Sequence, residues 1–190
     1  MVRHGRTEAN RAGLLLGRAD PELDDLGRRQ AAAVAASLGP VERVISSPLL
    51  RTRETAEAFG RAVELDDRWL ELDYGEWDGT PTRDVPPETW ARWRADTSFA
   101  PPGGESLASL GRRVRAACDD LADDARRHDV VVVTHVSPIK AALAWALDVD
   151  DHVSWRTFVT PASVMRVAVG PGGASLHGFN DRSHLVDLDG

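Results

Sequence analysis

Cysteine and lysine are almost missing from this chain of 190 residues. Cys118 is the only cysteine, which excludes an internal disulfide framework and a multi-cysteine zinc site. No run approaches the ~18 consecutive apolar residues of a membrane-spanning helix, and the start Met1-Val2-Arg3-His4 leaves no room for a signal peptide. We therefore expect a cytoplasmic protein without a membrane partner.

The charge balance is acidic, and the basic residues are nearly all arginine. The formal net charge is −7, and Lys140 is the single lysine among 23 lysine and arginine residues. An acidic chain without a basic run is a poor candidate for nucleic-acid binding, so we expect no nucleic-acid partner. Arginine nevertheless suits phosphate groups, because its guanidinium donates two parallel hydrogen bonds. The position of each arginine relative to the expected strands and helices must therefore indicate which arginines bind a ligand.

Strand-like and helix-like segments alternate along the chain. The expected strands are 41–45, 63–65, 130–133, 164–169 and 174–179, and the expected helices are 26–38, 48–60, 107–127 and 139–147. Residues 73–104 hold three of the six tryptophans and two proline pairs, and we interpret them as a small cap-like excursion. The alternation predicts one α/β domain over residues 1–190, a sandwich with a largely parallel sheet.

Polar clusters fall where three of the expected strands end. They are Arg3-His4-Gly5, Ser46-Ser47-Pro48 with Arg51, and Thr134-His135. The carboxyl ends of parallel strands meet at one edge of a sheet, where α/β proteins bind their ligands. Arg51 is expected in the first turn of its helix, a position that also favours an anion. The three clusters together predict one anion-binding site.

Histidine and arginine at one site suit phosphoryl transfer through a covalent intermediate. A neutral imidazole nitrogen of His4 can attack phosphorus while Arg3 and Arg51 disperse charge on the phosphoryl oxygens. The same two cations lower the proton affinity of His4 and keep it nucleophilic near neutral pH. A protonated His135 would stabilise the transferring group. The leaving alkoxide then needs a proton from a nearby carboxyl group, and this chemistry requires no metal or cofactor.

Five sequence blocks stand in a recognisable order over almost the whole chain. The blocks are RHGRTEAN at 3–10, GRADPEL at 17–23 with Gly27 and Gln30-Ala31, SSPLLRT at 46–52 with Thr55-Ala56, ELDYGEWDG at 71–79, and PGGES at 102–106. In this order they resemble the histidine phosphatase superfamily, in its phosphoglycerate-mutase-like branch. The segment THVSPIK at 134–140 looks like the acid phosphatase domains that actinobacteria fuse to ribonuclease H, which are related to α-ribazole phosphatases.

The resemblance implies a three-layer α/β/α sandwich with a mostly parallel central sheet. It also implies that His4 becomes phosphorylated during the reaction. Arg3, Arg51 and His135 would complete the phosphate pocket. Asn10 would add a hydrogen bond to the same phosphate.

Glu71 matches the acid/base position of the family. It would first protonate the leaving group and then activate the water that hydrolyses phosphohistidine. The resemblance thus implies a phosphoric monoester hydrolase of the histidine acid phosphatase type, with no metal or cofactor. Its partners would be a small phosphorylated metabolite and the phosphate ion released from it. The tryptophan-rich excursion would cover the pocket and select the substrate.

Two features depart from the family pattern. Val136 stands where the family usually has glycine, and its β-branched side chain is expected to reshape the pocket beside His135. We count Val136 among the phosphate-contacting positions. Only Met1 and Val2 precede the first block, so the first strand is expected to be short and to anchor His4 weakly.

Two other functions fit the same residues. One is a cofactor-dependent phosphoglycerate mutase, which must return the phosphoryl group to its substrate and needs a more enclosed pocket. The other is a catalytically inactive module that only binds phosphorylated ligands. Exposed tryptophans would fit either a substrate lid or the surface of a homodimer.

Overall fold

Six strands form one mixed sheet through the centre of the protein, in the order β3-β2-β4-β1-β5-β6. The computed structural model describes residues 1–188. The strands are β1 (Val2–Arg3), β2 (Arg43–Ser46), β3 (Val63–Leu65), β4 (Val130–Thr134), β5 (Val164–Gly170) and β6 (Gly173–Asp181). All pairs among the first four strands (β1 with β4, β4 with β2, and β2 with β3) are parallel, whereas β5 is antiparallel to both β1 and β6. The expected mostly parallel sheet is confirmed, and the expected β5–β6 hairpin forms one of its edges.

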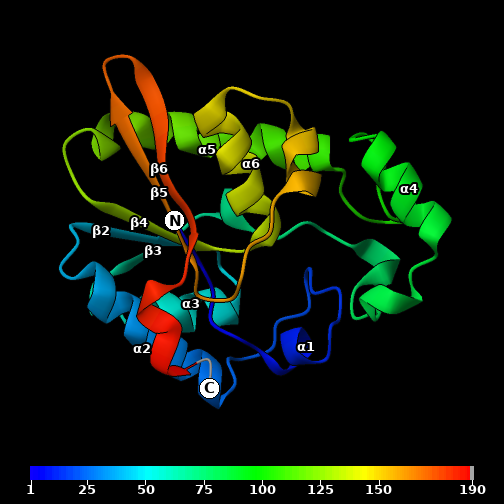
Figure 1. Ribbon diagram of the computed structural model, residues 1–190, viewed down its shortest axis with the longest axis horizontal. Coiled ribbons are helices and arrows are strands. Elements are labelled where there is room, and N and C mark those ends of the chain that lie inside the picture. Colours follow the sequence, from blue (N-terminus) through cyan, green and yellow to red (C-terminus); the bar gives the residue numbers. More distant parts are fainter. Residues whose placement is uncertain (189–190) are drawn as a thin grey trace.

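Helices cover both faces of this sheet (Figure 1). The α-helices are α1 (Glu8–Arg11), α2 (Asp25–Leu38), α3 (Leu50–Glu57), α4 (Pro87–Ala95), α5 (Leu107–Ala125) and α6 (Val136–Leu147). The 3-10 helices are η1 (Asp67–Trp69), η2 (Gly75–Trp77), η3 (Thr82–Asp84), η4 (Asp151–Arg156) and η5 (Ser183–Leu188). α2 packs against α3 and η5 on one face, and α5 packs against α6 on the other. This is the expected three-layer α/β/α arrangement.

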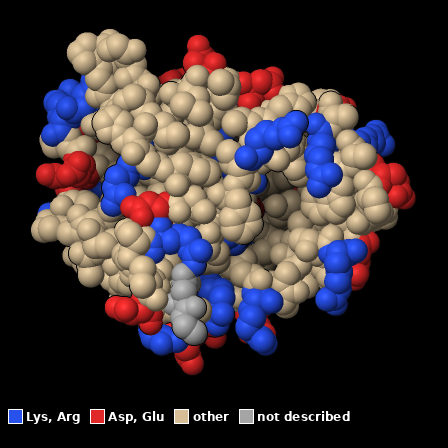
Figure 2. Space-filling view, viewed as in Figure 1, with Lys and Arg blue, Asp and Glu red and all other residues tan. Residues whose placement is uncertain are grey.

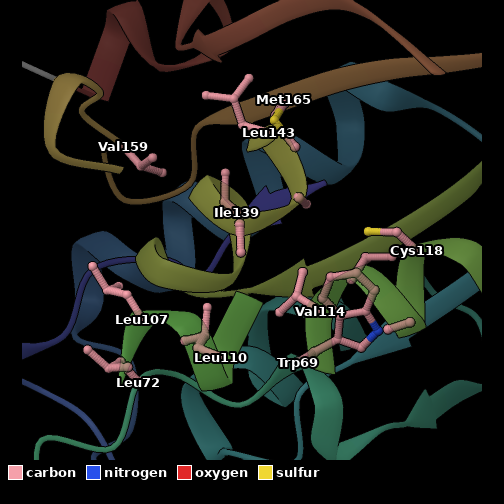
Figure 3. Packing of buried hydrophobic residues seen from close by; sticks show 14 of the residues in the cluster. Trp69, Leu72, Leu107, Leu110, Val114, Cys118, Ile139, Leu143, Val159 and Met165 are labelled. Carbon is pink, nitrogen blue, oxygen red and sulfur yellow. The ribbon is translucent and has the colours of Figure 1, made fainter. Parts of the chain in front are cut away.

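The larger hydrophobic core lies between the sheet and the α5–α6 layer. α5 buries Leu107, Leu110, Val114 and Cys118, which recur at intervals of three and four residues and so share one helix face. Figure 3 shows Leu107, Leu110 and Val114 on the side of Ile139 of α6, and Cys118 farther along, near Trp69. The single cysteine is therefore a buried residue of helix α5. Within residues 1–188, no helix has the combined length and apolar content that a membrane crossing needs.

β1 is only two residues long, yet its neighbours bond it on both edges. It pairs in parallel with β4 and antiparallel with β5. At its end, the Arg3 amide donates to the Ser163 carbonyl at 3.1 Å and the His4 amide donates to the Thr134 carbonyl at 3.0 Å. The expected weak anchoring of His4 is therefore wrong, because backbone hydrogen bonds hold the chain at the point where His4 begins.

Helix α6 begins three residues earlier than the sequence suggests, at Val136 instead of Ile139. His135 is extended and acts as the N-terminal boundary residue. Pro138 is then the third helical residue, where its missing N–H breaks no helical bond because first-turn amides have no partner within the helix. The amides of Val136 and Ser137 are consequently free to bind a group outside the helix.

Residues 73–104 leave the sheet and form η2, η3 and α4 at the side of the molecule (Figure 1). Trp93 of α4 is the centre of an aromatic cluster and is 1% exposed. Its ring centroid lies 5.6 Å from that of Trp77, 5.5 Å from Trp90 and 5.8 Å from Trp155 of η4. Aromatic packing therefore fastens the excursion to the segment that follows α6.

The loop after β1 touches the first turn of α2 backbone to backbone. A Cβ atom on Gly27 would lie 2.0 Å from the Arg6 carbonyl oxygen, and one on Gly5 would lie 2.4 Å from the Gly27 carbonyl oxygen. Neither backbone segment can yield without moving the residues beside His4. Glycine is required at both positions because the close approach leaves no space for a side chain.

Gly27→Ala is expected to lower the free energy of unfolding by about 2 kcal/mol or more, since the added methyl group overlaps backbone. Gly172→Ala is the matched control, because a Cβ atom there meets nothing within 4 Å. Urea unfolding of both variants and the wild type measures the difference. Equal stability of the two variants would contradict the proposed close approach.

Candidate active site

The pairing of β1 with β4 places two histidines side by side. Arg3 lies opposite Thr134 in parallel register, so His4 and His135 follow as the next pair at the carboxyl ends of the strands. Their ring centroids are 5.2 Å apart and their planes meet at 62°. His4 is 2% exposed and His135 is fully buried. Two of the three sequence clusters thus meet inside the protein.

One hydrogen bond settles which nitrogen of His4 can react. Nδ1 lies 2.7 Å from the carbonyl oxygen of Gly5, which only accepts, so Nδ1 carries the proton. The neutral ring then has its lone pair on Nε2. Gly5 is held in turn by its amide, which donates to Thr55 Oγ1 at 3.0 Å. The backbone therefore fixes both the tautomer and the orientation of a potential nucleophile.

Main-chain carbonyls orient the two predicted arginines. Arg3 donates from Nη1 to the Val159 carbonyl at 2.7 Å. Arg51 is fully buried in the first turn of α3 and donates to the carbonyls of Ala19 at 2.8 Å and Gly17 at 3.0 Å. Carbonyl acceptors are neutral, so they position a guanidinium without cancelling its charge.

Three buried nitrogens of this group have no hydrogen-bond partner within residues 1–188. They are Arg3 Nε, Arg51 Nε and His135 Nδ1. The other ring nitrogen of His135, Nε2, lies 2.9 Å from Ser47 Oγ. Unpaired buried polar atoms are costly, and an anion with several acceptor oxygens could satisfy them. Figure 2 shows a hollow between the positions of α1, α4 and α6, with lysine and arginine side chains around its rim.

Burial and nearby cations keep both imidazoles neutral. Burial, followed by the charges of Arg51 and Arg3, holds the pKa of His4 well below its ordinary value of 6.5. Burial and Arg51 likewise hold the pKa of His135 well below that value. Burial also lowers the pKa of the Arg3 guanidinium, to about 10. The arginines therefore stay charged near neutral pH while His4 keeps its lone pair. His135 is neutral in the absence of an anion.

Glu71 is the buried carboxylate among the four acidic residues of segment 71–78 and is 4% exposed. Its Oε1 accepts from the amides of Leu72 at 2.8 Å and Ser137 at 3.1 Å, and its Oε2 accepts from the amide of Val136 at 3.0 Å. The carboxylate thus sits on the N-terminus of α6, immediately after His135. The early start of this helix is what makes the two α6 amides available.

Asn10 and Val136 contribute differently from the other predicted residues. The Asn10 carboxamide oxygen accepts from the Thr7 amide at 3.1 Å and from Thr7 Oγ1 at 3.0 Å, which caps α1. Only the amide nitrogen of Asn10 is left to donate to an anion. Val136 acts on the site through its backbone amide, which binds Glu71, while its half-buried side chain lines an adjoining pocket.

Asp78 is a supporting residue to which we assign no role from the sequence. Its carboxylate accepts from the amides of Gly17 at 2.7 Å, Arg18 at 2.9 Å and Ala19 at 2.7 Å. The carbonyls of the first and last of these residues orient Arg51. Asp78 therefore holds the loop that positions the arginine. Its position within the sequence block at 71–79 could have identified Asp78 as a site residue. The block at 46–52 could have identified Ser47 in the same way.

No three histidine, cysteine, aspartate or glutamate side chains lie together as a metal site in the part of the chain that the structure describes. The site instead combines two cationic arginines and one carboxylate with two neutral histidines. The protein is therefore an α/β protein in which histidines and arginines form an anion site at the carboxyl ends of the strands. The comparisons with known proteins identify the family.

The chain belongs to the histidine phosphatase superfamily (branch 1), whose sequence profile matches residues 1–182. The chain is 38% identical over 185 residues to the Bifunctional protein Rv2228c of Mycobacterium tuberculosis. The aligned region covers 92% of this chain and 51% of that protein. It therefore spans about half the length of this relative. Phosphoserine phosphatase 1 of Hydrogenobacter thermophilus is 35% identical over 165 residues, covering 82% of this chain and 78% of that protein.

The fold agrees with these sequence relationships. Phosphoserine phosphatase of Entamoeba histolytica, solved in complex with 3-phosphoglyceric acid, superimposes with a TM-score of 0.90. The two sequences are 26% identical, and the match covers 97% of each chain. The expected phosphoglycerate mutase-like fold is therefore confirmed.

The lowered pKa values of His4 and His135 predict a specific pH dependence of stability. Below the ordinary value of 6.5 the unfolded chain takes up protons at these two side chains, whereas the folded protein does not. The free energy of unfolding should therefore fall by about 2 kcal/mol between about pH 7 and about pH 5.5. Urea unfolding in a phosphate-free buffer measures this slope.

His135→Asn should reduce that slope, because one of the groups with a lowered pKa is removed. His177→Asn is the control, since His177 is exposed and lies outside the site. A slope that is unchanged in His135→Asn would show that its pKa is not depressed.

Asp78→Ala is expected to weaken the binding of inorganic phosphate about tenfold or more, because the loop that orients Arg51 loses its acceptor. Unfolding stability should also fall by about 2 kcal/mol, as three amides lose a charged partner. Titration calorimetry with phosphate measures the first effect. Asp84→Ala is the control, since Asp84 is an exposed residue of the same excursion. Unchanged phosphate affinity in Asp78→Ala would refute the positioning role.

Proposed function

We propose that this chain is a phosphatase that hydrolyses small phosphomonoesters through a phosphohistidine on His4, without a metal ion. The observation that carries the proposal is the hydrogen bond from His4 Nδ1 to the Gly5 carbonyl. This bond leaves the lone pair on Nε2, in a buried site flanked by Arg3, Arg51 and His135. The family to which the chain belongs, and relatives that are themselves phosphatases, support the same conclusion.

In the first half of the reaction, His4 Nε2 forms a bond to phosphorus and the bond from phosphorus to the ester oxygen breaks. Arg3 and Arg51 stabilise the negative charge on the phosphoryl oxygens. The dianion also favours the protonated form of His135, because an opposite charge raises the pKa of an imidazole. The leaving alkoxide takes its proton from the carboxyl group of Glu71.

In the second half, water attacks the phosphorus of phosphohistidine and the bond from phosphorus to nitrogen breaks. Glu71, now a carboxylate, accepts the proton of that water and is ready for the next cycle. Inorganic phosphate leaves, and His4 regains its lone pair. The three amides that hold the Glu71 carboxylate support its place beside the reacting group throughout.

The acid-phosphatase type is supported by the lowered pKa of His4. A histidine that titrates well below 6.5 remains a nucleophile in mildly acidic solution. Substrates of small size are supported by the names of the relatives, which are phosphoserine phosphatases among others. Phosphoserine and 3-phosphoglycerate are therefore the first esters to test.

Product analysis by NMR, with a panel of phosphomonoesters and 3-phosphoglycerate, tests the proposal. Wild-type protein should release inorganic phosphate and form a phosphoryl adduct on His4 that mass spectrometry detects. His4→Ala should lose the adduct and about a thousandfold or more of the rate. His128→Ala is the control, because His128 is exposed, lies past the end of α5 and is hydrogen-bonded to Asp124.

Conversion of 3-phosphoglycerate to 2-phosphoglycerate without phosphate release would overturn hydrolysis in favour of a mutase. Binding of phosphate without an adduct or any turnover would instead indicate an inactive binding module. Either result would replace the proposed function, whereas His4-dependent phosphate release supports it.

A further inference from the structure

A pocket of about 160 Å³ lies next to Glu71. The three residues whose amides hold the Glu71 carboxylate, Leu72, Val136 and Ser137, all line this pocket. Tyr74 lines it as well, and the charges of Glu71 and Arg3 both act on its hydroxyl. The pocket therefore adjoins the reaction site on the side where the Glu71 carboxylate lies.

The position of Glu71 determines which part of a substrate enters this pocket. A proton donor must lie within hydrogen-bond distance of the leaving oxygen. The organic part of the ester continues from that oxygen, and so it extends toward the residues around Glu71. This step rests on the proposed function, in which Glu71 protonates the leaving group.

Indole rings make up much of the pocket wall. Trp90 and Trp93 of α4 stack with centroids 5.5 Å apart and planes at 11°, and Trp155 of η4 stands nearly perpendicular to Trp90, at 80°. The three rings contact one another, which restricts their movement. Flat apolar walls favour a flat apolar ligand, because rings gain both burial and aromatic contact.

The single lysine of the chain is also part of this pocket. Lys140 Nζ donates to the carbonyl of Ser154 at 2.8 Å, and its ammonium has two further protons to donate. All other positively charged side chains apart from histidine are arginines. A lysine presents a compact charge, whereas the broad guanidinium of arginine would occupy more of the small pocket. Burial lowers the pKa of Lys140, while the charge of Glu71 opposes that shift.

We propose that this pocket binds the leaving group of the substrate, and that this group is a single aromatic or heteroaromatic ring carrying a carboxylate. The ring would pack against Trp90 and Trp155, and the carboxylate would accept from Lys140 Nζ. The size agrees with one ring, since an apolar cavity of roughly 150 Å³ in another protein binds benzene. Lys140 is then the residue that determines specificity, while His4 and Glu71 perform the chemistry.

Matched phosphate esters separate the contribution of the aromatic ring to kcat/KM from the contribution of the carboxylate. The probes are 4-carboxybenzyl phosphate, 4-methylbenzyl phosphate and methyl phosphate, which has no ring. Wild-type kcat/KM should be at least about tenfold higher for the carboxybenzyl ester than for the methylbenzyl ester, as expected for a charged hydrogen bond. Methyl phosphate reports the basal chemistry at His4.

Two variants and one control assign the effects to the pocket. Lys140→Met should bring the two benzyl esters to equal kcat/KM, mainly by raising KM for the carboxybenzyl ester. Trp155→Leu should lower kcat/KM for both benzyl esters about tenfold more than for methyl phosphate. Trp145→Phe is the control, because Trp145 donates to Asp119 of α5 and lies outside this pocket.

Binding of the product alcohol, 4-(hydroxymethyl)benzoate, tests the pocket without catalysis. Ligand-observed NMR should detect binding to the wild type and at least about tenfold weaker binding to Lys140→Met. If methyl phosphate is hydrolysed but neither the preference nor this binding depends on Lys140, the pocket proposal is wrong and the phosphatase proposal stands. If no ester is hydrolysed, the phosphatase proposal fails, and the alcohol titration still decides whether the pocket binds an aromatic carboxylate.

Discussion

The site depends on the parallel pairing of β1 with β4. That pairing is two residues long, and it sets Arg3 opposite Thr134. A shift of one residue would turn His4 to the other face of the sheet, because successive side chains of a strand alternate. The His4 amide extends the same ladder by bonding to the Thr134 carbonyl. The distance between the two imidazoles is therefore a property of the sheet and not of the loops that follow it.

Around this pair, the protein uses neutral backbone groups to hold charged side chains. Carbonyls orient Arg3 and Arg51, a carbonyl binds His4 Nδ1, and amides hold Glu71. The two carbonyls that orient Arg51 are closer to its guanidinium than the Asp20 carboxylate, which lies 4.0 Å from Nη1. Burial first, and then the charges of Arg51 and Arg3, lower the pKa of His4 even without a ligand. One arrangement therefore both attracts an anion and keeps the nucleophile unprotonated.

The aromatic pocket brings together parts of the chain that are distant in sequence. Trp90 and Trp93 lie in the excursion, Lys140 lies in α6, and Trp155 lies in η4. The tryptophan-rich composition of 73–104 points to the first two. Trp155 follows no local pattern that identifies it, because it reaches the pocket through the packing of η4 against α4. Residues that select a substrate are for this reason harder to predict than residues that perform chemistry.

Local patterns in the sequence determined the alternation of strands and helices, and the strand ends where His4, Arg51 and His135 lie. They could do so because periodicity, turn residues and ordered motifs are short-range properties. Only the tertiary structure decided that a two-residue β1 suffices, since its stability comes from strands far along the chain. It also decided that α6 begins early enough to offer two amides to Glu71. Hydrogen-bond partners of that kind depend on which segments meet in space, and no local pattern contains that information.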